Sequence, residues 1–593
     1  MKRLLVALCL LWLVGCTESS GNLEVTSDSV AGASLFRVDV WAQEPGRDLV
    51  EGQTFSSDAS MTFSDVPSGR WSVLVQAQDS AGTTLSHFRA DVDISADRTT
   101  TLHAGPFRPG LPDSVSQTGF TVDSLGANDA ATLVAFFPAP NNTDASIPGT
   151  LGVGDASANR GQLTRVGYDE TTVAHRCLPA DLMASEMMAC NQAIARGQAN
   201  LRSLPQRFEE LAQGDTQDFF VVTSGQTVTC QKMLAEASTV HCVIFAEVVN
   251  GTPVLTATTA QSIADAFDSN NPFGTGGIYD RVHQVFGSEW SDSGGRDGDD
   301  KIILVYLSSS SIGGSGLFGF FRPSDELAAT SVSNSNEGEI LYLNADKATG
   351  DLFDALATLA HEFQHMCHYN QKVAQNGTFP SGAVADEFTF DEGLSVLSEQ
   401  LNGFTLEAAS GGNNFMFRAV QQFLADPDQP FFTFASRLRD YGAGYLLIRY
   451  LHDREGVAAV TAFATSTQSG RAGFTATTGI DFQEFFTDWC QTNLVNDLTG
   501  APTALHYDSL SLTGSFTIRD LGNSTLPGLT IDTVKNPPLD EALSLSFGPW
   551  APTYVRFEGG DGSSLNLQLT ASTVELVSNL VVESPVGTYS STQ

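Results

Sequence analysis

The apolar positions of the chain repeat with two different periods, one typical of strands and one typical of helices. Over residues 23–107, segments such as 36–41 and 71–77 alternate apolar and polar residues and are separated by turn residues. This pattern predicts a small β-sandwich. Three prolines then mark a linker: Pro106, Pro109 and Pro112.

Short apolar stretches return on both sides of the middle of the chain. Residues 113–250 combine predicted strands, such as 219–222, with one helical stretch at 180–213 that Pro205 interrupts. We expect a β-rich module there. Residues 503–593 again show short alternating segments, which predict a C-terminal β-sandwich.

The middle of the chain, residues 251–500, has mainly helical periodicity. Residues 354–360 contain no Gly or Pro, and apolar side chains recur three and four positions apart at Leu356, Leu359 and Phe363. This spacing predicts a helix packed on the core. Residues 388–397 indicate a short loop followed by a second apolar helix. Further helices are expected after residue 400: 414–425, 444–453 and 482–494.

A predicted sheet precedes these helices. Residues 301–307 form an apolar run typical of a buried strand, and residues 335–344 predict another strand. Residues 308–321 are rich in Ser and Gly and predict a flexible segment. The acidic turn at 297–300 could hold Ca²⁺, but without further loop ligands a plain turn is the better interpretation. The chain is therefore predicted to be multidomain, with an α+β central domain of a sheet subdomain and a helical subdomain, flanked by β-sandwich-like domains.

The chain is strongly acidic. Its 593 residues include 30 Lys and Arg against 68 Asp and Glu, which gives a net charge of −38. A surface of this sign repels the phosphates of nucleic acids, so DNA or RNA binding is not expected. The acidic residues are spread along the chain rather than gathered in one block, which is typical of a solvated surface. No pattern indicates an oligomeric state.

Residues 1–16 form an export signal. Two basic residues precede an apolar run at 4–14 that is too short to cross a bilayer, and a small residue and Cys16 follow. Residues 13–16 (L-V-G-C) resemble the lipobox of bacterial lipoproteins, which implies that Cys16 carries lipid and anchors the exported chain to a membrane. Thr17 after the cysteine favours the outer membrane, and residues 17–22 are a polar tether. Ordinary secretion with an unmodified Cys16 is the alternative.

Six cysteines remain once Cys9 leaves with the signal and Cys16 is lipidated. An even number in an exported chain predicts disulfides. The simplest pairing joins local neighbours and leaves the last two cysteines for each other: Cys177–Cys190, Cys230–Cys242 and Cys367–Cys490.

Residues 361–365 (H-E-F-Q-H) carry the candidate chemistry of the first predicted helix. His361 and His365 lie one turn apart on one helix face, so both imidazoles can reach a single metal ion, and Glu362 projects beside it, where a water would bind. This is the H-E-x-x-H arrangement of a zinc hydrolase. Two partly exposed helical histidines beside a glutamate are the alternative interpretation. A metal-ligand role for Cys367 competes with its disulfide, but two residues after His365 it points away from the ligand face.

A catalytic zinc site needs a third protein ligand and one open position. Glu392 is the best candidate, because Gly393 beside it allows a close approach of backbones and the following apolar residues would hold its helix against the first. His368 is expected to support the ligands from behind or to face solvent. Three other carboxylates are not excluded by spacing: Asp386, Glu387 and Asp391.

Four stretches resemble the hyicolysin-type zinc metallopeptidases of bacteria. The first two are residues 359–365 (L-A-H-E-F-Q-H) and, after the 26 residues that follow His365, residues 392–395 (E-G-L-S). The others are residues 335–344 (S-N-E-G-E-I-L-Y-L-N) and residues 440–450 (D-Y-G-A-G-Y-L-L-I-R-Y). The resemblance covers the middle half of the chain.

This resemblance implies a zincin-like catalytic domain over residues 251–500, with one Zn²⁺ held by His361, His365 and Glu392. The implied activity is the hydrolysis of peptide bonds within protein or peptide substrates. A zinc-bound water would attack the bond, with Glu362 as the general base.

The resemblance also implies that a tyrosine donates to the oxyanion, with Tyr441 as the candidate and Tyr445 as the fallback. Packing as a core aromatic is the alternative for both. It implies that residues 335–344 form an edge strand that pairs with an extended peptide. Two other functions stay open. One is a zinc aminopeptidase, in which Glu337 and Glu339 would bind the free amine, and the other is a catalytically inactive surface lipoprotein that only binds partners.

Overall fold

The computed structural model divides the chain into two compact units, Met1–Asp113 and Ser114–Gln593. The structure describes residues 20–27, 35–42, 50–56, 61–67, 69–78, 84–94, 98–104, 108–109, 119–122, 124–139, 147–153, 160–161, 180–195, 208, 210–274, 276–289, 301–374, 384–535, 541–571 and 576–592. Cys16, Cys177 and the acidic turn at 297–300 lie outside these residues. Within the described ranges, no helix is both long and apolar enough to cross a membrane.

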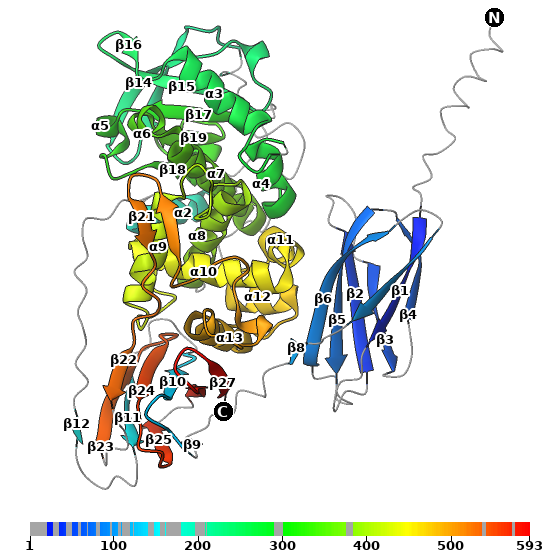
Figure 1. Cartoon of the computed structure of the whole chain (residues 1–593). Helices are drawn as coiled ribbons and strands as arrows, with labels where there is room; N and C mark the ends of the chain where they lie inside the picture. The colour runs from blue at the N-terminus through cyan, green and yellow to red at the C-terminus, as the bar shows by residue number, and fades with distance from the viewer. Residues whose placement is uncertain are drawn as a thin grey trace, which may run out of the picture. The chain divides into compact units, whose positions relative to one another are not determined.

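The first unit is built from two β-sheets with the strand orders β4-β1-β7 and β3-β2-β5-β6-β8 (Figure 1). The strands are β1 (Ser20–Ser27), β2 (Leu35–Ala42), β3 (Val50–Ser56), β4 (Met61–Pro67), β5 (Gly69–Gln78), β6 (Thr84–Ile94), β7 (Thr99–Ala104) and β8 (Arg108–Pro109). Alternate side chains turn inward, so that Leu23 and Val25 of β1 are both buried. Because β1 begins at Ser20, residues 20–22 of the expected tether belong to a sheet.

A seven-stranded sheet forms one end of the second unit, with the order β13-β14-β15-β17-β19-β18 and β16 paired to β15. Its strands are β13 (Thr216–Val221), β14 (Gln226–Lys232), β15 (Cys242–Val249), β16 (Thr252–Pro253), β17 (Ile302–Leu307), β18 (Gly319–Phe321) and β19 (Ile340–Asn344). The continuous apolar runs of β17 and β19 are buried throughout, as expected for central parallel strands. The sheet ends at β18, which runs antiparallel to β19.

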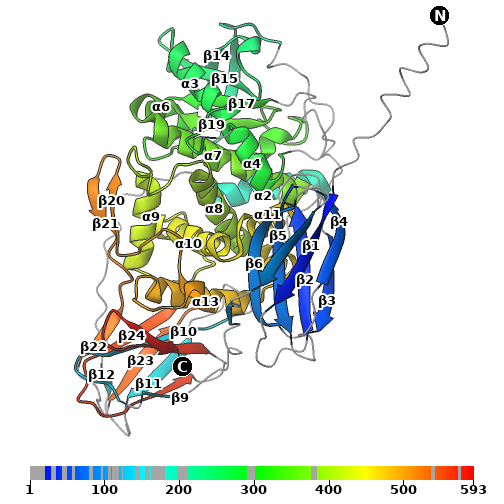
Figure 2. The same ribbon diagram turned by 45° about the vertical axis from the view of Figure 1, so that its right-hand side comes forward.

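Helices that precede and follow these strands pack near the sheet: α3 (Ala257–Asp268), α4 (Ile278–Phe286), α5 (Ser309–Ile312), α6 (Ala345–Gly350) and α7 (Leu352–Tyr369). Asp351 starts α7, because its carboxylate accepts a hydrogen bond from Phe353 N (3.1 Å). The expected apolar stripe of this helix is found, since Leu359 and Phe363 are fully buried. α7 packs against β18, β19, α4 and α8, which places it at the centre of the second unit (Figure 2).

A helical layer follows α7: α8 (Val384–Leu401), α9 (Asn414–Ala425), α10 (Leu438–Glu455), α11 (Val457–Thr465), α12 (Gly470–Thr478) and α13 (Phe482–Val495). The expected helices at 414–425 and 482–494 agree with α9 and α13, and the one at 444–453 lies within the longer α10. The expected loop at the start of 388–397 is wrong. Residues 384–392 contain no Gly or Pro, so α8 runs through them without a break.

Two glycines let α8 and α10 pack backbone against backbone. A Cβ at Gly393 of α8 would lie 2.5 Å from the Gly444 carbonyl oxygen of α10, and a Cβ at Gly444 would lie 2.9 Å from the Thr389 carbonyl oxygen. On another side of α10, a Cβ at Gly442 would lie 2.0 Å from the Ala419 carbonyl oxygen of α9. The helix α10 is therefore fixed between α8 and α9 by positions at which only glycine fits.

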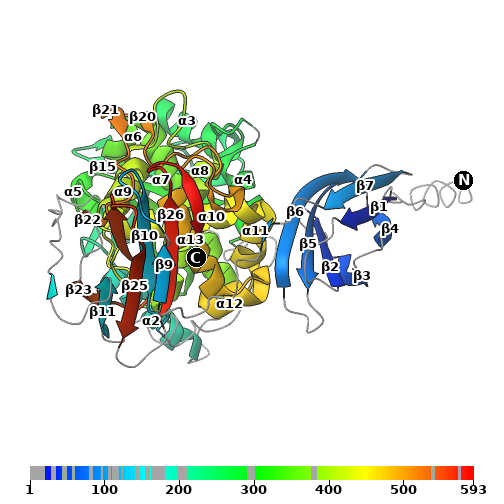
Figure 3. The ribbon, with the colours of Figure 1, turned by 60° about the horizontal axis from the view of Figure 1, so that its bottom comes forward.

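Two five-stranded sheets form the other end of the second unit, with the orders β22-β24-β10-β26-β27 and β12-β23-β11-β25-β9 (Figure 3). The strands from the start of the unit are β9 (Gly119–Val122), β10 (Ala130–Phe136), β11 (Ile147–Val153) and β12 (Arg160–Gly161). Those from its end are β22 (Asp532–Lys535), β23 (Glu541–Phe547), β24 (Thr553–Glu558), β25 (Leu565–Ala571), β26 (Val577–Glu583) and β27 (Tyr589–Thr592). Along the chain, α2 (Ala180–Ala195) follows β12. The hairpin of β20 (Ser515–Ile518) and β21 (Gly522–Thr525) comes just before β22.

These pairings correct two expected domains. Residues 113–250 are not a separate module, because their first strands join the C-terminal sheets and β13–β15 join the seven-stranded sheet. Residues 503–593 do not form a sandwich alone, because β10 lies between β24 and β26 and β11 lies between β23 and β25. Pairing of strands from distant parts of the chain leaves no local mark on the sequence, so periodicity cannot reveal it.

Two expectations about the seven-stranded sheet are also wrong. Residues 308–321, expected to be flexible, contain α5 and the buried strand β18. Residues 335–344 do contain the strand β19, but β19 pairs on both sides and is not an edge strand. Because Gly319 has no side chain, β18 can take the edge position close to α7, where a Cβ at 319 would come within 2.9 Å of Thr358 Cγ2.

The expected disulfide Cys230–Cys242 is wrong, and the thiols of both residues are free. Cys230 pairs with Glu247 on β15, and Cys242 lies five residues away on that strand. That separation is about 16 Å in a β-strand, whereas disulfide-bonded Cα atoms lie within about 7 Å.

The pair Cys367–Cys490 is wrong as well, since both thiols are free and buried. Cys367 lies beside His283 and Glu289, whereas the backbone carbonyl of Cys490 accepts a hydrogen bond from the Tyr554 hydroxyl (3.1 Å). The remaining pair, Cys177–Cys190, stays a prediction because Cys177 lies outside the described residues.

We expect the thiols of Cys230, Cys242, Cys367 and Cys490 to be free, because each is buried and unbonded. Protein unfolded in guanidinium chloride without reductant should be alkylated at all four positions, as measured by peptide mass spectrometry. A linked peptide pair containing Cys367 and Cys490 would contradict the structure.

Gly393→Ala should destabilise the second unit. The added methyl group would meet the Gly444 carbonyl at 2.5 Å, and overpacking of this kind costs about 1–3 kcal/mol. Alanine is favoured over glycine in a helix by about 1 kcal/mol. The variant is therefore less stable only if the cost of overpacking exceeds this gain in helix propensity. The measurement is the midpoint of thermal unfolding.

Gly350→Ala is the matched control, because the same methyl group at this helical position meets no atom within 4 Å. Its midpoint should stay the same or rise. Equal midpoints for the two variants would show that α8 and α10 do not depend on this contact.

Candidate metal centre

His361 and His365 of α7 and Glu392 of α8 bring three ligand atoms together. These atoms all lie within 4.8 Å of one another. Glu392 Oε2 is 3.3 Å from His361 Nε2 and 3.6 Å from His365 Nε2. Metal–ligand bonds of about 2.0–2.2 Å separate tetrahedral ligand atoms by roughly 3.3–3.6 Å. Both contacts therefore have the spacing of ligands around one ion.

Two further carboxylates orient the imidazoles toward Glu392. His361 Nδ1 donates to Glu399 Oε1 (2.9 Å), and His365 Nδ1 lies 3.0 Å from Asp391 Oδ2. Hydrogen bonds at Nδ1 leave Nε2 of each ring as the ligand atom and fix the ring plane. The donor set of two imidazoles and one carboxylate suits a divalent transition metal with one open position.

The structure separates Glu392 from the other carboxylates that spacing left open. Asp391 contacts the far nitrogen of His365, so it orients a ligand and does not complete the group. Glu387 pairs with His368 Nε2 (2.7 Å) and accepts a hydrogen bond from Gly470 N (2.7 Å). His368 is thus buried behind the group. The expectation that it supports the ligands from behind remains, and the alternative that it faces solvent is wrong. The side chain of Asp386 lies outside the described residues.

Electrostatics at the site favour a bound cation. Burial alone would raise the pKa of Glu392, but the neighbouring His365 and His361 outweigh it and lower the pKa to about 2. Burial would lower the pKa of His361, but its bonds to Glu392 and Glu399 raise it. Both shifts show that the carboxylate stays ionised and that positive charge is stabilised at its side.

Glu362 lies beside the ligand group on α7 and is fully buried. Its Oε2 accepts a hydrogen bond from Phe321 N of β18 (3.0 Å), and its Cγ is close enough to Gly319 that a Cβ there would lie 3.1 Å away. Its Oε1 has no hydrogen-bond partner among the described residues. Burial raises the pKa of Glu362 to about 7, against the lowering effect of His365 and His361. A carboxylate of this pKa can both accept and release a proton near neutrality.

The two tyrosines of α10 have different surroundings. The Tyr441 ring lies 6.4 Å from the His361 ring, centroid to centroid, and packs against Phe415. The Tyr445 hydroxyl donates to Gln400 Oε1 (2.7 Å) and accepts from Arg449 Nη1 (2.8 Å), so it is engaged in another buried network. Of the two candidates, only Tyr441 is found next to a ligand of the group.

A cavity of about 590 Å³ is lined mainly by α6, the start of α7 and α9, and none of the residues of the ligand group lines it. Phe318, which directly precedes β18, lines it on one side, and Phe415, which packs against Tyr441, lines it on another. The cavity therefore reaches neighbours of β18 and of Tyr441 but contains no residue of the ligand group.

Sequence reasoning missed two parts of the site. Glu399, the partner of His361, lies seven residues after Glu392 on α8, and this two-turn spacing is a signal that could have found it. β18 carried no such signal, because its contact with Glu362 depends on sheet order.

A scan of the chain against protein-family profiles gives no match, and a search among curated proteins also finds none.

Proposed function

We propose that the chain is a zinc-dependent endopeptidase. The observation that carries the proposal is the convergence of His361 Nε2, His365 Nε2 and Glu392 Oε2, with Glu362 next to them on the same helix. The likeness of residues 359–365 and 392–395 to hyicolysin-type metallopeptidases, and the zincin-like domain that it implies, point the same way. In this proposal the three converging residues hold Zn²⁺, which supplies Lewis acidity toward a water and a peptide carbonyl.

The residues of the chain then have separate tasks in the reaction. Glu362 takes the proton of the attacking water on its Oε1 and passes it to the leaving amine, while Phe321 N holds its Oε2 in place. Tyr441 donates its hydroxyl proton to the oxygen that gains negative charge. Glu399 and Asp391 keep the two imidazoles oriented during turnover.

An extended peptide would bind along β18, and not along residues 335–344 as the sequence predicted. Phe318 O accepts a hydrogen bond from Asn344 N, so by alternation Gly319 and Phe321 direct their polar groups away from β19. Phe321 N is engaged by Glu362 Oε2, so the amide and carbonyl of Gly319 and the carbonyl of Phe321 would pair with the peptide main chain. Such pairing would bind many sequences with little selectivity.

The export signal and the lipobox-like residues 13–16 extend the proposal to location. In this interpretation lipid on Cys16 holds the enzyme at the outer membrane or cell surface, and residues 17–113 separate the peptidase from the anchor along the chain.

The aminopeptidase alternative gains no specific support. Glu337 accepts a hydrogen bond from Ala329 N (2.9 Å), and Glu339 is fully buried ahead of β19. Among the described residues, neither belongs to a metal-ligating group. Cleavage of peptides with blocked N-termini would separate the two activities, and the inactive binding protein would contain no zinc.

The first test separates the ligand from the base. Glu362→Gln should keep zinc and lose hydrolysis, because the ligands survive without their proton carrier, whereas Glu392→Ala should also lose the zinc ion of this group. Metal analysis and a peptide cleavage assay on the purified full chain measure both effects. Full zinc content in Glu392→Ala would give the third-ligand role to another carboxylate, and full activity of Glu362→Gln would end the proposed mechanism.

The second test concerns Tyr441. Its hydroxyl would bond mainly in the transition state, so Tyr441→Phe should lower kcat on the order of 10²- to 10³-fold with little change in KM or zinc content. Tyr445→Phe is the matched control on the same helix. It removes a hydroxyl that serves Arg449 and Gln400, so it should reduce stability while kcat per folded molecule stays the same. The reverse pattern would transfer the role to Tyr445.

A further inference from the structure

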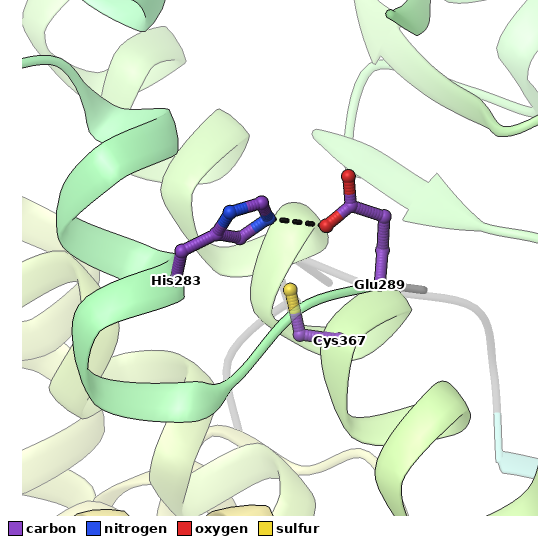
Figure 4. Close-up of side chains that lie close together, drawn as sticks. All are labelled: His283, Glu289 and Cys367. Carbon is purple, nitrogen blue, oxygen red and sulfur yellow. Dashed lines mark hydrogen bonds and ion pairs between the residues drawn. The ribbon is translucent and has the colours of Figure 1, made fainter. Parts of the chain in front are cut away.

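Three side chains of metal-ligating type meet at a second place, behind α7. His283 of α4, Glu289 after the end of α4 and Cys367 of α7 bring their ligand atoms within 4.8 Å of one another. Figure 4 shows the His283 ring and the Glu289 carboxylate in contact, with the Cys367 sulfur pointing toward the space beside them. The donors are an imidazole nitrogen, a carboxylate oxygen and a thiol sulfur, a set that suits Zn²⁺.

This group is distinct from the one at His361 and His365. Cys367 lies two residues after His365, and two residues of α-helix turn the side chain by about 200°. Its sulfur therefore lies on the face of α7 that meets α4. Phe363 lies on the same face of α7, one turn earlier. The Phe363 ring packs against Tyr279 at 5.5 Å and against His283 at 5.5 Å.

The surroundings of the three donors are negative and dry. Glu289 is 1% exposed and Cys367 is fully buried, while the side chain of His283 is 23% exposed and forms the solvent side. The Glu289 carboxylate also accepts hydrogen bonds from the hydroxyls of Tyr279 and Ser288 (both 3.3 Å), and a divalent cation at the three donors would offset its buried negative charge.

We infer that His283, Glu289 and Cys367 form a second Zn²⁺ site, which ties α4 to the back of α7. On binding, the sulfur–metal bond forms and the thiol proton leaves to solvent, while the ion replaces the direct contact between the ring and the carboxylate. Three protein ligands leave a fourth position at the partly exposed side of His283, where a water completes the tetrahedron. Because Cys367 and His365 share α7, the site stabilises the helix that carries the first ligand group.

Cobalt is the probe that separates this site from the first, because only this site contains sulfur. The full chain with Glu392→Ala, purified without metal and then given Co²⁺, should show thiolate-to-cobalt charge-transfer absorption in the near ultraviolet. The same absorption should be absent when Cys367→Ser is added to Glu392→Ala. Cys490→Ser in the same background is the matched control, since Cys490 is also buried and free but lies in α13, and it should keep the absorption.

Zinc content gives a second readout, and its wild-type value does not depend on the folding of any variant. The wild-type chain should bind about two ions, and Cys367→Ser and Glu392→Ala should each bind about one. A wild-type chain with a single ion that Glu392→Ala removes, and no thiolate absorption with Co²⁺, would overturn the second site while leaving the proposed peptidase intact. Loss of metal from Glu362→Gln or Glu392→Ala bears only on the first group, so the two proposals fail separately.

Discussion

The burial of charge between α7 and α8 is the constraint on which the rest of the structure depends. Glu362, Glu392 and Glu399 lie in this interface with two imidazoles and are at most 5% exposed. Buried carboxylates are costly unless positive charge or hydrogen bonds compensate them. The histidines, the Phe321 amide and Asn413, which donates to Glu399 Oε2 (2.7 Å), supply part of this compensation. A cation between Glu392 and the two Nε2 atoms would supply more.

The helices around this charge are held by contacts that leave little freedom. Gly393 and Gly444 allow α8 and α10 to meet through their backbones, and Gly442 does the same for α10 and α9. Gly319 lets β18 approach α7 closely enough for Phe321 N to reach Glu362. Glycine therefore recurs where a helix or strand approaches the ligand group, because a methyl group there would move Glu392 or Glu362 by a fraction of an ångström.

The two C-terminal sheets pack against α13 of the helical layer rather than forming an independent domain. Phe136 of β10 packs edge-on against Phe486 of α13 (5.0 Å between ring centroids), and the Trp550 indole donates to Ala139 O (2.8 Å). The Tyr554 hydroxyl reaches the backbone of α13 at Cys490. Strands from both ends of the second unit are thus needed to cover one face of the helices, so neither end is an appendage of the central part.

The sequence by itself determined the local elements and much of the candidate site. The spacing of His361, Glu362 and His365 follows from helical geometry alone, because one turn separates the histidines wherever the helix lies. Glu392 could be ranked first from its neighbour Gly393, since a missing side chain is visible in a sequence. Tertiary structure alone decided what depends on distant pairing: that β18 is the edge strand, that β9–β12 join β22–β27, that Cys367 meets His283 and Glu289, and that Asp391 and Glu399 orient the imidazoles. Local periodicity reports which face of an element is apolar, but it carries no information about which distant element covers that face.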